Sequence, residues 1–133
     1  MEKLYLGARV VFGLWFTYAG IEYFLPQVFT QPLGEMPAAQ NFILALIASH
    51  IFAVVKALEL VVGLLILANR WVLAAALLAL PMTGVIVWWN VVLEGTPVPV
   101  VFGIVTPALN LFLLWPYRYL LCPLLQVDPK RAW

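Results

Sequence analysis

The sequence predicts an all-α, polytopic membrane protein: a bundle of four transmembrane helices in one domain that covers residues 1–133. Hydrophobic residues make up 65% of the chain and the mean hydropathy is +1.04, whereas about 45–50% apolar residues is usual in soluble domains. Charged residues make up 10%, too few to cover a water-soluble globule. The net charge of +1 argues against nucleic acid as a partner, because such partners require a basic face.

Four apolar segments account for this composition, and each is long enough to cross a bilayer. They cover about residues 4–25, 42–68, 71–93 and 98–121. A spanning helix needs about 20 apolar residues, and backbone groups inside the hydrocarbon must bond to one another, which favours helices. The second segment corresponds to about 40 Å of helix, so we expect a tilt or an overhang into the interface.

Prolines, glycines and polar residues separate the segments. Residues 26–41 contain three prolines and a glycine and are predicted to form a loop, whereas the "ANRW" of residues 68–71 is predicted to be a tight turn. The "EGTPVP" of residues 94–99 ends the third helix and begins the fourth. Pro81 and Pro107 fall inside helices and are expected to kink them. The first segment lacks a small-x-small cleavage site before Glu22, which favours a helix over a signal peptide.

The basic residues predict the orientation. Apart from Lys56 inside the second segment, they are Lys3, Arg9, Arg70, Arg118, Lys130 and Arg131, which lie at the two ends of the chain and in the second loop. The first and third loops contain no Lys or Arg, but carry Glu35 and Glu94. Because Lys and Arg are enriched on the cytoplasmic side, both termini are predicted to be cytoplasmic.

The near absence of cysteine and histidine limits the chemistry. Cys122 is the single cysteine, so a Cys-x-x-Cys thiol–disulfide relay is excluded. One histidine and no cysteine cluster do not supply a usual metal-ligand set, and no metal site is predicted. We also expect no covalently bound cofactor, because the chain lacks residues that hold haem, flavin or an iron–sulfur cluster.

Polar residues inside the helices predict an inner cluster of Arg9, Lys56, Glu59 and Asn110. Counted from the middle of each segment at ~1.5 Å per residue, Lys56 and Asn110 lie near the midplane. Glu59 lies about 6 Å and Arg9 about 8 Å to the cytoplasmic side by the same count. Because an unpaired charge at the membrane centre costs at least ~2.5–3.5 kcal/mol, we expect Arg9 and Glu59 to pair. Lys56 and Glu59 share a helical face at i, i+3.

A second, outer cluster is predicted from Glu22, His50 and Asn90. These residues come out about 11, 8 and 12 Å toward the outer side. On a helical wheel His50 points nearly opposite to the inner cluster's glutamate, so the two clusters are separate. Gly13 and Gly20 lie close to the arginine's stripe on the first helix, and we expect that side to approach a neighbouring helix closely.

Two stretches resemble the DoxX family of small bacterial inner-membrane proteins: "ARVVFGLWFTYAGIEYFLP" and "VVKALELVVGLLILANRWVLAAALLALP". The specific part is a Lys-x-x-Glu-Leu before a Gly-Leu-Leu-x-Leu run and an Asn-Arg turn, in residues 56–70. The resemblance covers roughly residues 7–93 and implies a four-helix bundle in the bacterial inner membrane, in a quinol-oxidase or thiosulfate:quinone oxidoreductase context. Distant animal relatives are receptor chaperones or cargo receptors. Many members carry Lys where this chain has Tyr23, so a role for that charge does not carry over.

Two functions remain open. In the first, the pocket of Arg9, Lys56 and Glu59 receives a quinone head group or a small oxyanion, with Glu59 as the candidate proton relay. A redox or sulfur-metabolism partner protein would then exchange the electrons. In the second, the protein is a non-enzymatic scaffold, chaperone or assembly subunit and the charged trio is structural. The trio has a formal surplus of one positive charge. Either Lys56 is neutral by desolvation, or Glu22 reaches inward, or the site receives a group with negative charge or a carbonyl oxygen; the surplus favours the first function. Besides the lipid bilayer, a second copy of the chain is a partner that the sequence leaves open.

Overall fold

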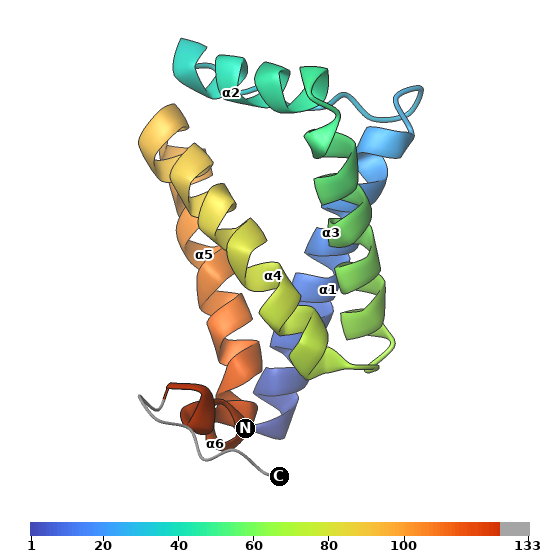
Figure 1. The fold of residues 1–133 in the computed structure, drawn as a ribbon, viewed down its shortest axis with the longest axis vertical. Coiled ribbons are helices and arrows are strands. Elements are labelled where there is room, and N and C mark those ends of the chain that lie inside the picture. The colour runs from blue at the N-terminus through green and yellow to red at the C-terminus, as the bar shows by residue number, and fades with distance from the viewer. Residues whose placement is uncertain (126–133) are drawn as a thin grey trace, which may run out of the picture.

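The structure, a computed structural model that describes residues 1–125, consists of helices joined by short connections (Figure 1). Its long helices are α1 (Glu2–Phe24), α2 (Pro37–Ala48), α3 (Ile51–Leu67), α4 (Val72–Val87) and α5 (Pro97–Leu114). A π-helix, η1 (Trp88–Glu94), continues α4, and the short elements η2 (Trp115–Tyr117), α6 (Arg118–Leu121) and η3 (Cys122–Leu125) follow α5. The all-α prediction is confirmed for the described residues.

Three helical stretches are long and apolar enough to cross a membrane. They are Glu2–Phe24, Val72–Glu94 and Pro97–Leu125, and the bent pair of α2 and α3 supplies a fourth if it counts as one span. The α3 helix alone has 17 residues, which is the lower limit for a spanning helix, about 17–25 residues. Residues 1–125 therefore contain three to four segments with the properties of transmembrane helices.

The single long helix predicted for residues 42–68 is wrong. The chain bends by 91° between α2 and α3, and His50 adopts a left-handed conformation with φ of 62° at the bend. The Ser49 hydroxyl donates a hydrogen bond to the carbonyl of Leu46 at 3.0 Å, within the last turn of α2. Serine side chains that bond to nearby backbone favour helix ends, and histidine is among the residues enriched in left-handed conformations. The surplus length of this segment thus forms a separate helix instead of a tilt.

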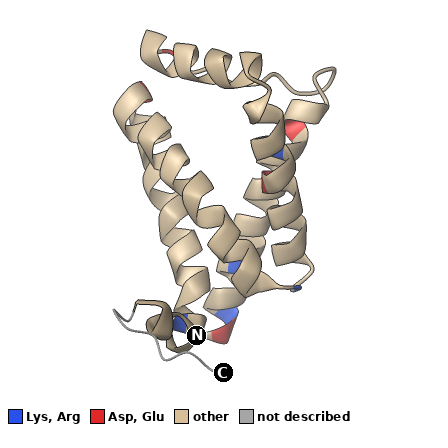
Figure 2. Cartoon of the chain, in the orientation of Figure 1, with Lys and Arg blue, Asp and Glu red and all other residues tan. Residues whose placement is uncertain are grey.

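The α2 helix lies across one end of the bundle, and the N-terminus lies at the opposite end (Figure 1). It begins at Pro37, five residues before the predicted start, with Met36 in an extended conformation as its N-cap. Pro is favoured in the first turn of a helix, where its missing N–H leaves no bond unmade. Figure 2 shows the Lys and Arg residues toward the end opposite α2, except for one on α3, which is Lys56. Lys130 and Arg131 lie outside the described residues.

The hydrophobic core occupies the half of the bundle away from α2. Its members are Ala8, Phe12 and Phe16 of α1, Val62 and Ile66 of α3, Ala75, Ala76, Ala79 and Met82 of α4, and Leu113 and Leu114 of α5. The helices α1, α3, α4 and α5 each contribute the half that lies nearer to the N-terminus of the chain (Figure 1). Toward α2, the pair of α1 and α3 separates from the pair of α4 and α5 (Figure 1). This arrangement leaves the polar residues of the other half around a cavity.

Candidate functional site

A cavity of about 1280 Å³ lies between the two helix pairs, beneath α2. Its wall contains residues from α1, α2, α3, α4, η1 and α5, and from the loop that precedes α2. Most of these residues are apolar or aromatic. The polar and charged side chains in the wall are Glu22, Thr30, Gln31, Glu35, Lys56, Glu59, Asn90, Glu94 and Thr96. An apolar cavity with a few convergent polar groups is the usual form of a small-molecule site.

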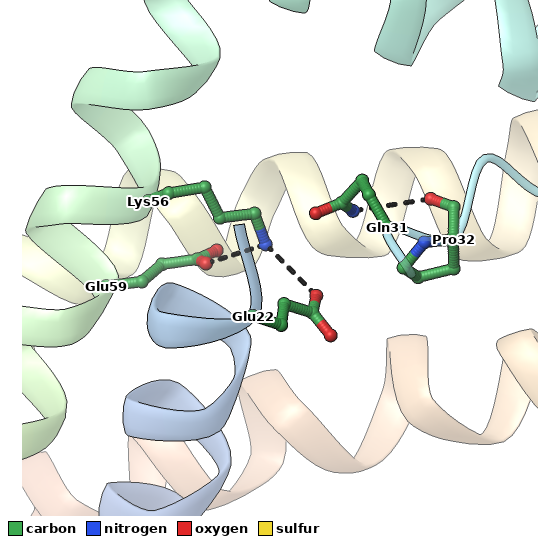
Figure 3. A network of polar contacts seen from close by, with 5 residues as sticks. All are labelled: Glu22, Gln31, Pro32, Lys56 and Glu59. Carbon is green, nitrogen blue, oxygen red and sulfur yellow. Dashed lines mark hydrogen bonds and ion pairs between the residues drawn. The ribbon is translucent and has the colours of Figure 1, made fainter. Parts of the chain in front are cut away.

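Three charged side chains meet in the wall of this cavity. Lys56 Nζ lies 3.0 Å from Glu59 Oε2 and 3.7 Å from Glu22 Oε1 (Figure 3). All three residues are buried, with 7%, 5% and 7% of their surfaces exposed for Lys56, Glu59 and Glu22. The ammonium group also lies 5.1 Å from the centre of the Phe52 ring, within the range of a cation–π contact. We call Glu22, Lys56 and Glu59 the charged triad.

Glycines bring the two helices of the triad together. A Cβ on Gly20 would lie 2.5 Å from the backbone nitrogen of Leu60, and a Cβ on Gly13 would lie 2.8 Å from the side chain of Leu67. The predicted close approach of the glycine side of the first helix is therefore confirmed. Because the helices are antiparallel, these two contacts place Glu22 opposite residue 58, between Lys56 and Glu59.

The predicted pairing of Arg9 with Glu59 is wrong. Among the described residues no carboxylate lies within 4.0 Å of Arg9, and the helix register places Arg9 about 18 Å along α1 from the level of Glu59. The depth count failed because it used the middle of residues 42–68. Because α2 turns away, the span consists of α3 alone, and its middle is residue 59. Lys56 and Glu59 therefore both lie about 6 Å closer to the α2 end than the count had placed them. The i, i+3 contact of Lys56 with Glu59 is confirmed.

Asn110 does not join the charged triad. Its side chain is fully buried, and its Nδ2 donates a hydrogen bond to Thr83 Oγ1 at 3.3 Å. The Thr83 hydroxyl donates in turn to the carbonyl of Leu80, the residue before Pro81, at 2.9 Å. Asn110 therefore links α5 to α4 and lies outside the residues that line the cavity. The predicted inner cluster is thus divided among three places.

The predicted outer cluster does not form a separate group, because Glu22 pairs with Lys56 of the predicted inner cluster. Glu22 and Asn90 both line the cavity, and Asn90 Nδ2 donates a hydrogen bond to the carbonyl of Ile86 at 2.8 Å. His50 is exposed at the bend between α2 and α3 and is not part of the cavity wall. Its role is conformational, at the position where the chain changes direction.

Glu94 is a buried residue that sequence reasoning placed in an outer loop. Its carboxylate accepts hydrogen bonds from the backbone N–H groups of Glu35 at 3.0 Å and Met36 at 3.2 Å, and from the Thr96 hydroxyl at 3.1 Å. Met36 is the N-cap of α2, so the carboxylate takes the position where a helix N-terminus favours negative charge. No local signal identified this role, because the donors are 58 and 59 residues away.

Besides Glu94, another residue of η1 forms a hydrogen bond to α2. Trp89 Nε1 donates to the carbonyl of Ala39 at 3.1 Å. Gly34 has a φ of +88°, and a Cβ there would lie 2.5 Å from Glu94 Oε2, so this position requires glycine for both conformation and space. The loop and α2 are thus fixed above the cavity through η1. Short π-helical segments occur frequently at functional sites.

Aromatic rings form much of the apolar wall. The Trp15 and Phe102 rings are stacked, with centroids 5.0 Å apart and planes 9° from parallel, and Trp89 and Phe52 also line the cavity. Tyr23 lies just outside and contacts the Phe52 ring edge-on, with centroids 5.3 Å apart. The site combines flat apolar surfaces with one buried group of charges.

The triad reverses the charge balance expected from the sequence. Two carboxylates and one ammonium sum to −1, whereas the expected trio of Arg9, Lys56 and Glu59 sums to +1. The carboxylates of Glu22 and Glu59 can accept hydrogen bonds, and either of them can take up or release a proton. Comparisons of the chain with protein-family models, with curated proteins and with solved structures find no match.

Proposed function

We propose that the protein binds a small amphipathic molecule dissolved in the membrane, with the polar head of that molecule at the charged triad. The single observation that supports this proposal is the cavity of about 1280 Å³ with Glu22, Lys56 and Glu59 buried in its otherwise largely apolar wall. Three ionisable groups in such a place are costly, and intramembrane ionisable residues mark ligand or ion pathways by default.

A purely structural role explains the triad less well. The α1 and α3 helices already approach so closely at Gly20 and Gly63 that a Cβ at either position would overlap the partner helix. Their association is therefore fixed by backbone packing, and the ion pairs are not needed to hold the two helices together. A scaffold or chaperone also gains nothing from a cavity of this size, whereas a ligand-binding protein does.

A quinone head group is one ligand chemistry that fits the residues. Lys56 is placed to donate a hydrogen bond to a quinone carbonyl, and Glu22 or Glu59 to accept a proton from a quinol hydroxyl. The stacked pair of Trp15 and Phe102 offers a flat wall for a ring. A small oxyanion fits poorly, because Arg9 is distant and the carboxylates outnumber the cation. Electrons would have to pass to a redox or sulfur-metabolism partner protein, as in the DoxX context that the sequence resembles.

We place the protein in the bacterial inner membrane with four membrane crossings, α2 and α3 together forming the second. Both termini then lie in the cytoplasm, as the positive-inside rule favours for Lys3, Arg9, Arg70 and Arg118. The cavity opens in the outer half of the bilayer in this orientation, and α2 lies along the outer surface.

Thermal unfolding in zwitterionic nanodiscs tests the proposed function, because a ligand that binds the folded state raises its stability with concentration. We expect a short-chain ubiquinone or its quinol to stabilise the wild type and to lose this effect in Lys56→Met. The matched control is Lys3→Met, which removes the same charge at an exposed position and should behave as the wild type. Failure of every membrane-soluble probe, neutral or charged, to stabilise a folded wild type would contradict the proposed function.

A further inference from the structure

The charges that surround the cavity are unequal in number. Lys56 is the single cation among the described residues that line it, against four carboxylates. Glu94 is already satisfied by two backbone N–H groups and a hydroxyl, and Glu35 is exposed at the rim. The remaining two, Glu22 and Glu59, share Lys56. With all three groups ionised, the buried part of the site therefore carries one net negative charge.

Glu22 is the carboxylate with the weaker partner. Its distance to Lys56 Nζ is 3.7 Å, whereas Glu59 lies at 3.0 Å. In Figure 3 one Glu22 oxygen faces Lys56 and the other points away from it. A negative charge with incomplete pairing inside a membrane protein is unfavourable, so this side of the triad is where a further cation gains most.

Two aromatic residues precede Glu22 on the same side of α1. Trp15, Tyr18 and Glu22 follow one another at i, i+3 and i+7 on α1 and all line the cavity, so they form one stripe of the helix. Aromatic faces attract ammonium groups, most strongly where water is excluded. Phe52 already contacts the Lys56 ammonium group in this manner within the same cavity.

A neutral acceptor completes the set. The Gln31 Oε1 atom is buried without a hydrogen-bond donor among the described residues, while its Nε2 donates to the Pro32 carbonyl at 3.3 Å. In the view of Figure 3 the Gln31 oxygen points toward the side on which the triad lies. A buried acceptor without a donor is unfavourable. The N–H of a protonated amine supplies a donor, whereas a quaternary ammonium group has none and gains only from the carboxylate and the rings.

We propose that the head group bound at the triad is a cation, namely an amine or quaternary ammonium group on an apolar molecule. The positive charge binds between Glu22 and the rings of Trp15 and Tyr18, and the apolar remainder occupies the cavity beneath α2. This inference rests on the proposed function and narrows its ligand class, because a cation neutralises the triad whereas a quinone leaves its charge unchanged.

Three probes of nearly equal size test this inference by thermal stabilisation in micelles of an uncharged maltoside detergent, whose head group carries no ammonium: benzyltrimethylammonium, its neutral isostere neopentylbenzene, and benzenesulfonate. We expect the cation to bind the wild type about tenfold more tightly than the neutral isostere and the anion not to bind. Glu22→Gln should remove the advantage of the cation and leave the affinity of the neutral isostere unchanged. The control Glu2→Gln makes the same change at an exposed position and should preserve the advantage.

The comparison of the three probes on the wild type decides the inference even if Glu22→Gln does not fold. Equal binding of cation and neutral isostere, or a preference for the anion, would overturn it. Binding of a short-chain ubiquinone without binding of the cation would overturn the cation inference and leave the proposed function standing. If neither the quinone nor any of the three probes binds, the proposed function fails as well.

Discussion

Replacing Gly20 by alanine should force α1 and α3 apart. The new Cβ would lie 2.5 Å from the nitrogen of Leu60 and 2.7 Å from its Cβ. Carbon contacts are most favourable at about 3.5–4.0 Å, so the helices must separate by roughly 1 Å here. The obstacle is backbone, which a change of rotamer cannot relieve.

The expected net effect of Gly20→Ala is a loss of about 1–2 kcal/mol of unfolding free energy. Overpacking costs about 1–3 kcal/mol, and alanine returns about 0.8–1 kcal/mol through its better helix propensity. Since Glu22 lies two residues further along α1, the displacement should also lengthen its 3.7 Å contact with Lys56 and weaken ligand binding.

Chemical unfolding in a mild detergent measures this change, and Gly7→Ala is the matched control. Gly7 lies on the same helix, and a Cβ there would meet nothing within 4 Å. Gly7→Ala should therefore keep or raise the stability, by up to about 1 kcal/mol. A Gly20→Ala variant as stable as the wild type would refute the close contact of α1 with α3 and the helix register that places Glu22 at the triad.

Two further predictions concern α2 and the orientation. Glu94→Gln removes the negative charge of the carboxylate that accepts hydrogen bonds from the N–H groups of Glu35 and Met36, so hydrogen exchange at these two amides should accelerate. The control Glu35→Gln should leave exchange at the amide of Met36 unchanged. Unchanged exchange in Glu94→Gln would show that η1 does not hold α2. In intact cells, a membrane-impermeant thiol reagent added outside should not label Cys122, which is exposed and lies on the cytoplasmic side in the proposed orientation, but should label Glu35→Cys. The opposite labelling pattern would reverse the proposed orientation.

Several features of the fold and site follow from local sequence alone. The apolar segments predicted helices because hydropathy and length act within each segment. The contact of Lys56 with Glu59 follows from the geometry of one helix, where residues three apart are neighbours. The close approach at Gly13 and Gly20 follows from the absence of side chains. None of these features depends on the position of a distant part of the chain.

The residue of α1 that lies beside Lys56 and Glu59 could not be predicted in the same way. The depth of Lys56 and Glu59 depends on where the second span begins. That point depends on whether the chain runs straight from α2 into α3 or bends at His50. Hydropathy does not distinguish the two cases, because α2 is apolar in both. Placing Lys56 at the midplane selected Arg9 as the neighbour from α1, whereas the observed bend selects Glu22.

The sequence by itself determined that this protein consists of apolar helices with a charged motif inside one of them, since composition and helical spacing act locally. Tertiary structure alone decided which charges meet, and therefore the sign of the site, because glycine contacts between α1 and α3 set the register that brings Glu22 to Lys56. It also decided that a cavity exists, because the α2 helix is held across the end of the bundle by Glu94, whose backbone donors lie 58 and 59 residues away in the chain.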